Sequence, residues 1–94
     1  MTYFPFSKEK FTIGDAILVH WGSEKWPAKI VENPNLSGIK PPKPGIKSHV
    51  VYFFGENNYQ RVNENKIEIY KKPDMISKLP KKMRLAHVEI MNHL

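Results

Sequence analysis

The stretch GDAILVHWGSEKWPAKI, residues 14–30, contains the signals that decide the fold. Gly14 and Asp15 form a turn signal ahead of an apolar, β-branched run, which predicts a buried strand over residues 15–21. A second strand is predicted over residues 26–32, with Pro27 at its start or on a sheet edge, where a strand needs no backbone donor. The stretch therefore predicts a hairpin, and it places both tryptophans of the chain, Trp21 and Trp26, around one polar turn.

Three more strands and a helix are predicted downstream. Residues 48–55 form the strongest strand, residues 58–62 follow across a short turn, and residues 66–70 form a brief fifth strand. Between the second and third strands, residues 33–45 hold four of the eight prolines, which predicts a long loop. Because closure removes exposed strand edges, five short strands favour a small antiparallel β-barrel.

The C-terminal segment has a different period. From Pro80 onward, apolar residues recur at spacings of three and four, which predicts a helix. Its buried face is predicted to hold Met83, Ala86, His87, Ile90, Met91 and Leu94. The fold class is therefore mainly β with a C-terminal α-helix, within the size of one small domain.

The net charge of +6 is concentrated in two segments. Residues 40–49 carry three lysines and no acid, and residues 71–84 carry five lysines and one arginine against one acid. Clustered basic charge indicates a polyanion partner, whereas an ordinary solvated basic surface is the alternative interpretation.

Several function classes find no support in the sequence. Cysteine is absent and the four histidines are scattered, so we expect neither a metal site nor a cofactor. The five glycines form no phosphate-binding loop, and no serine has an evident histidine–acid arrangement, so we do not expect an enzyme. No apolar run reaches the roughly 18 residues of a membrane span, so we expect no membrane partner.

The order of these motifs resembles the PWWP domain family. Gly14-Asp15 opens the first strand, as in the family. The family's tetrapeptide corresponds to residues 24–27, which end in Trp26-Pro27 and are followed by Ala28, as is usual in the family. VVYFFG at residues 50–55 resembles the family's aromatic third strand. The segment KLPKKMRL at residues 78–85 is similar to the family's basic helix start. The resemblance covers about residues 11–94. It implies one domain over residues 1–94, with the barrel at about 11–70 and a basic linker and helix at about 71–94.

The resemblance implies a chromatin reader with an aromatic cage. Such a cage binds a methylated lysine, most often lysine 36 of histone H3. Trp26 and Phe53 match the family's cage positions, but Ser23 stands where members usually carry the third aromatic residue. Trp21 is the candidate replacement, and Ser23 and Glu56 are candidates for the rim of the cage.

The resemblance also implies a basic surface for nucleosomal DNA. Its candidate residues are Lys78, Lys81, Lys82 and Arg84 at the helix start, Lys71 and Lys72 before it, and Lys40, Lys43 and Lys47 in the loop. We expect a nuclear protein that forms part of a larger chromatin-associated protein or complex. Two alternatives stay open: a nonspecific DNA- or RNA-binding barrel with a non-functional cage, and a scaffold domain that docks a protein partner.

Overall fold

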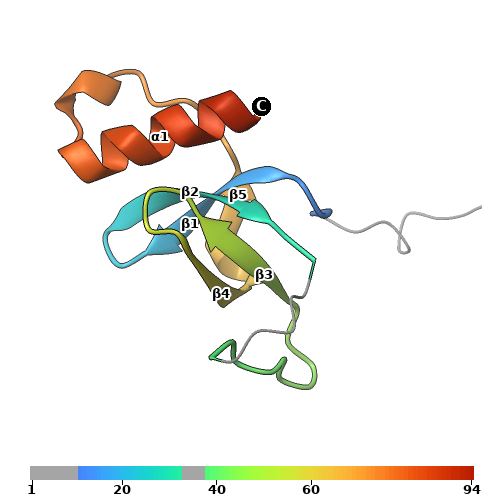
Figure 1. Cartoon of the computed structure of the whole chain (residues 1–94). Coiled ribbons are helices and arrows are strands. Elements are labelled where there is room, and N and C mark those ends of the chain that lie inside the picture. Colours follow the sequence, from blue (N-terminus) through green and yellow to red (C-terminus); the bar gives the residue numbers. More distant parts are fainter. Residues whose placement is uncertain (1–10, 33–37) are drawn as a thin grey trace, which may run out of the picture.

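The computed structural model describes residues 11–32 and 38–94, and it consists of an antiparallel sheet and a C-terminal helix (Figure 1). The strands are β1 (Ala16–Trp21), β2 (Glu24–Ile30), β3 (Ser48–Phe53), β4 (Asn58–Asn63) and β5 (Ile67–Ile69). Two short 3₁₀ turns, η2 (Glu64–Lys66) and η3 (Ile76–Lys78), precede β5 and the helix α1 (Lys81–His93). The predicted fold class, five antiparallel strands followed by a helix, is confirmed.

The five strands form one curled sheet in the order β4-β3-β2-β1-β5. Residues from all five strands meet in a single core cluster, which includes Val62 of β4 and Ile67 of β5. Within the described part of the chain, no backbone ladder joins β4 to β5. The sheet therefore wraps around its core as a barrel does but is not closed by hydrogen bonds.

The register assigns every second residue to the inner face of this sheet. Ile17 pairs with Ala28 and with Ile69, and Ala28 pairs with Phe53. Because paired residues in antiparallel strands point to the same side, these positions and those two residues away from them share the inner face. Ile17, Ala28 and Phe53 belong to the inner core and are at most 5% exposed.

Helix α1 packs against the outer face of the sheet, above β1 and β2 in Figure 1. Ala86 and Ile90 are fully buried there and pack with Phe54, which follows β3. Gly55 makes this close approach possible, because a Cβ on it would lie 3.1 Å from the Cβ of Ala86. Its backbone N–H also donates to the Glu89 carboxylate at 2.9 Å, which connects the end of β3 to the helix.

Pro27 lies in the middle of β2, a central strand, and not at the start of a strand as predicted. The Phe54 N–H donates to the Pro27 carbonyl at 3.1 Å, but Pro27 has no N–H to donate in return. The indole N–H of Trp26 donates to the Phe54 carbonyl instead, at 2.7 Å. A side-chain hydrogen bond therefore replaces the missing backbone bond, and this allows proline in a central strand.

Other expectations are also refined by the structure. Residues 33–37 of the predicted proline-rich loop and residues 1–10 of the predicted domain lie outside the described residues. On α1, Met83, Ala86, His87 and Ile90 are buried as predicted. Leu94 follows the last helical residue and is 71% exposed, so the prediction that it joins the buried face is wrong.

Among the described helices, none is both long and apolar enough to cross a membrane.

The role of the Trp26 indole can be measured with Trp26→Phe. This variant leaves the Phe54 carbonyl without its donor, so we expect the free energy of unfolding to fall by about 1–3 kcal/mol in urea titrations. Trp21→Phe is the matched control, because Trp21 is 51% exposed, and it should cost less than about 0.5 kcal/mol. Equal losses in the two variants would contradict the assigned role of the Trp26 bond.

Candidate functional site

A small pocket with aromatic walls opens at one end of the inner core, and we call it the cage pocket. It has a volume of about 210 Å³ and is lined by Trp21, Trp26 and Phe53, with Glu24, Glu56, Asn58 and Gln60 at its polar edge. The Trp21 and Phe53 rings meet edge to face, with centroids 5.3 Å apart and planes at 63°. All three residues predicted as cage walls therefore line one pocket.

The hairpin register brings Trp21 into this pocket. Trp21 pairs with Glu24 and Val19 pairs with Trp26, so all four residues lie on the inner face. Ser23 lies in the exposed turn and is not among the residues that line the pocket. The pocket is therefore lined by Trp21, two residues before Ser23, and not by Ser23 itself.

Two carboxylates give the cage pocket a negative edge. Glu56, a predicted rim residue, lines it and forms an ion pair with Lys82. Glu24 also lines it, and it has no ion pair with any described residue. Sequence reasoning missed Glu24, although its place between the two tryptophans could have indicated it. Aromatic faces beside an unpaired carboxylate suit a desolvated organic cation.

A basic pocket of about 260 Å³ lies on the other side of Trp21. Its lining includes Trp21, two predicted lysines, Lys40 and Lys43, and two cations that sequence reasoning missed, Arg61 and Lys66. The Arg61 guanidinium donates to the Lys40 carbonyl at 2.8 Å and to the Ser48 hydroxyl at 3.1 Å. These bonds hold Arg61 in place within the pocket. Only the folded sheet shows this grouping, because the four cations come from the loop, β4 and η2.

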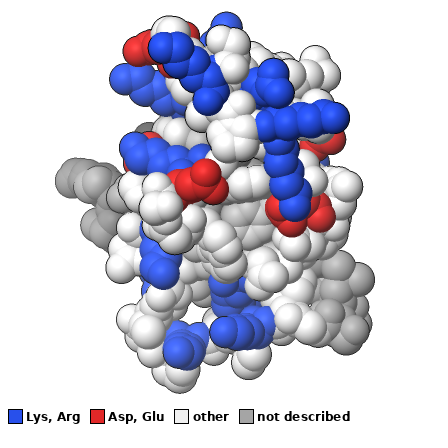
Figure 2. Space-filling model, turned by 90° about the vertical axis from the view of Figure 1, so that its left-hand side faces the viewer, with Lys and Arg blue, Asp and Glu red and all other residues white. Residues whose placement is uncertain are grey.

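The nine predicted DNA-binding residues are all exposed, and most lie near one of two ends of the molecule. Figure 2 shows the face that carries the β1–β2 turn, with basic side chains over the helical end at the top and over the β2–β3 loop at the bottom. Acidic side chains lie between these two groups. Lys47 belongs to the lower loop but lines a separate hollow beside Asn63 and Glu64.

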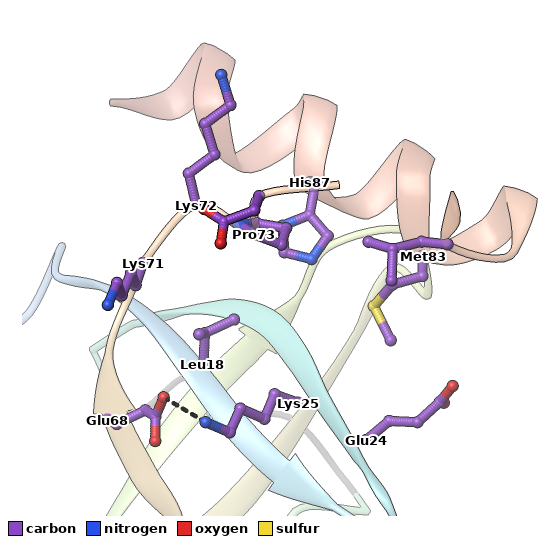
Figure 3. A pocket seen from close by; sticks show the side chains of 11 residues that line it. Leu18, Glu24, Lys25, Glu68, Lys71, Lys72, Pro73, Met83 and His87 are labelled. Atoms are coloured by element: carbon purple, nitrogen blue, oxygen red, sulfur yellow. Dashed lines mark hydrogen bonds and ion pairs between the residues drawn. The ribbon is translucent and has the colours of Figure 1, made fainter. Parts of the chain in front are cut away.

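A further hollow, which we call the helix groove, lies between α1 and the sheet (Figure 3). It has a volume of about 370 Å³. Leu18, Pro73, Leu79 and Met83 supply its apolar lining, and the His87 ring descends into it from α1. Its charged lining consists of Glu24, Lys25, Glu68, Lys71, Lys72 and Asp74. Lys71 and Lys72, predicted to bind DNA, therefore lie at this groove.

Two titratable groups of the groove have shifted pKa values. Hydrogen bonds from His20 and Lys25, at 2.8 and 3.2 Å, hold the pKa of the Glu68 carboxyl below its usual value. Burial lowers the pKa of His87, which is only 4% exposed. The Nδ1 atom of His87 lies 2.9 Å from the Tyr70 hydroxyl. Its imidazole is therefore neutral near pH 7.

The model of the PWWP domain family matches residues 14–92. The chain belongs to the PWWP domain family. Among solved structures, it is similar to the second PWWP domain of WHSC1L1 protein, with a TM-score of 0.69 and 23% identity over 92% of this chain and 84% of that chain. No curated protein matches the sequence.

Membership in the PWWP family establishes the general class of the domain. PWWP domains are known chromatin-reader modules, which bind partners and do not act as enzymes. Within residues 11–32 and 38–94, no group of three or more histidine, cysteine or acidic side chains is arranged to hold a metal ion.

Burial of His87 makes the stability of this PWWP domain depend on pH. Because its folded pKa is depressed, the unfolded chain binds the proton more readily, so the stability falls as pH falls below about 6.5. We expect His87→Gln, which keeps a polar partner for Tyr70, to flatten the dependence of unfolding free energy on pH between pH 7 and 5. His93→Gln, on the exposed end of α1, serves as the control. An unchanged pH dependence in His87→Gln would refute the assignment.

Proposed function

We propose that this PWWP domain binds a methylated lysine of a histone tail in the cage pocket and nucleosomal DNA through the basic groups around it. The proposed lysine is lysine 36 of histone H3, which the family resemblance favours. The observation that carries the proposal is the arrangement of one face, where a pocket with aromatic walls and an acidic edge lies beside a pocket of four cations.

The chemistry of the cage pocket supports a methylated ammonium as its ligand. Methylation removes hydrogen-bond donors from the ammonium but leaves its positive charge, so ring faces and apolar contact replace water well. Trp21, Trp26 and Phe53 offer such surfaces, and Glu24 adds a negative charge at the entrance. Because Glu56 already pairs with Lys82, Glu24 makes the main electrostatic contribution to binding of the methylated ammonium.

The basic groups support phosphate binding beside the cage. Lys40, Lys43, Arg61 and Lys66 can neutralise phosphates on one side of Trp21. The cations at the start of α1 are also exposed and can contact phosphates, namely Lys78, Lys81, Arg84 and Lys82, the last of which is shared with Glu56. Figure 2 shows basic side chains over this helical end of the molecule. Nonspecific contacts of this kind depend strongly on salt, with a log–log slope near −5 for about six phosphates.

The two contacts would reinforce each other on one nucleosome. A histone tail and the DNA beside it are tethered, so binding of one raises the effective concentration of the other. Two weak sites can therefore give a useful joint affinity. A reader of this kind acts in the nucleus, as a non-enzymatic part of a larger chromatin-associated protein or complex.

The cage is tested with histone H3 peptides around lysine 36, trimethylated or unmethylated, in titrations followed by tryptophan fluorescence. We expect the trimethylated peptide alone to bind, and Trp21→Ala to weaken that binding by about 1–2 kcal/mol, roughly tenfold in Kd. Trp21 is preferable to Trp26 for this test, because Trp26 also bonds to Phe54 and its loss would affect the fold.

Tyr59→Ala is the matched control for the cage, because Tyr59 is an exposed aromatic residue of β4 that does not line the cage pocket. It should leave peptide binding unchanged. If neither peptide binds while DNA does, the domain is a nucleic-acid-binding module with a non-functional cage. If neither the cage variant nor charge variants change binding to nucleosomes, the alternative of a protein-docking scaffold is favoured.

The DNA contact is tested by the salt dependence of binding to a duplex. Lys43→Ala should weaken binding to all sequences and reduce the log–log slope by about one, because it removes one phosphate contact. Lys29→Ala removes the same charge from the other side of the sheet, where its Nζ lies 5.6 Å from the Tyr52 ring centroid, and should leave the slope unchanged. Equal slopes in the two variants would exclude the basic pocket as the DNA contact.

A further inference from the structure

The helix groove has the features of a binding site that the cage and the basic pocket do not explain. Its interior is apolar, with Leu18 and Met83 at most 5% exposed, and its volume of about 370 Å³ falls within the usual range of ligand pockets. Figure 3 shows these side chains directed into the space between α1 and the sheet. This hollow can therefore hold an apolar group of substantial size.

One buried polar atom faces this hollow. His87 is 4% exposed, and its Nδ1 atom is engaged with Tyr70. Its Nε2 atom has no hydrogen-bond partner among the described residues, and the ring lines the groove. Buried polar groups are normally hydrogen-bonded, so an unpaired imidazole nitrogen in an apolar pocket indicates a missing partner. A peptide group suits this atom in either tautomer, because it offers both a carbonyl acceptor and an N–H donor.

The charges at the groove favour an uncharged occupant. Three lysines, Lys25, Lys71 and Lys72, are matched by three acids, Glu24, Glu68 and Asp74. Lys25 is already paired with Glu68 at 3.2 Å, as the dashed line in Figure 3 marks. The rim therefore gives no strong net attraction to an anion or a cation, in contrast to the cage pocket and the basic pocket.

Position connects the groove to the cage. Glu24 lines both hollows, so they are neighbours across a single side chain. A peptide with its methylated lysine in the cage would pass Glu24, near the turn of the β1–β2 hairpin, to reach the groove on the outer face.

We propose that the helix groove binds an apolar side chain of the peptide whose methylated lysine occupies the cage, with a peptide group of that segment hydrogen-bonded to His87 Nε2. This inference rests on the proposed function, and it adds a second specificity position. The domain then selects its target by two features of one peptide: a methylated lysine and a large aliphatic or aromatic residue near it in sequence.

The test uses a library of trimethyl-lysine peptides in which each flanking position carries Leu, Ala or Glu in turn. At one position we expect the peptide with Leu to bind about tenfold more tightly than the peptide with Glu, because the groove would bury part of the aliphatic side chain. Leu79→Ala, which alters a partly buried wall of the groove, should reduce this preference to less than about threefold. Leu85→Ala, on the exposed side of α1, is the matched control and should preserve it.

A second readout uses the unaltered protein and needs no variant to fold. The ¹⁵N signal of the His87 imidazole should shift when the Leu peptide binds and remain in place with the Glu peptide. The inference would be overturned if binding depends on methylation but shows no preference for Leu, or if Leu79→Ala leaves that preference intact. Either result would still support the cage as the methyl-lysine site. A His87 signal that moves with a DNA duplex and not with peptide would also overturn it. Loss of methyl dependence itself would remove the proposed function, and this inference with it.

Discussion

The hydrogen bond from the Trp26 indole to the Phe54 carbonyl is the interaction on which the rest of this PWWP domain depends. Pro27 leaves a gap in the backbone ladder of a central strand, and the indole of the preceding residue fills it at 2.7 Å. This bond joins β2 to the end of β3 and fixes the plane of the Trp26 ring. It also helps to position Gly55, where a Cβ would lie only 3.1 Å from the Cβ of Ala86 on the helix.

The same sheet face provides both the hydrophobic core and the candidate cage. The inner face of β1 carries Ile17, Val19 and Trp21 in succession. Ile17 and Val19 are fully buried, whereas Trp21 is 51% exposed. The cage pocket is therefore the open end of the core, not a separate structure. A residue such as Trp26 contributes to folding and to the proposed recognition together, so stability and binding are coupled in this domain.

The outer face of the sheet is covered by α1, and this packing creates the helix groove and organises the charges. The helix buries His87 against Tyr70 and holds Lys82 close to Glu56 at the cage. At the other end of the molecule, the β2–β3 loop brings Lys40 to Arg61. Two basic segments that are distant in sequence thus lie on either side of the aromatic pocket, although acidic side chains separate them on the surface.

The sequence alone determined where the five strands and the C-terminal helix lie along the chain, and the family resemblance pointed to two of the three aromatic residues that line the cage pocket. These follow from local signals: turn residues, apolar periodicity and motifs such as Trp26-Pro27 with the aromatic third strand. Only the tertiary structure decided the face of Trp21, the place of Glu24 at the cage and the grouping of Arg61 with the loop lysines. The physical reason is register. A shift of one residue moves a side chain to the opposite face of a sheet, and long-range pairing, which local patterns do not encode, sets that register.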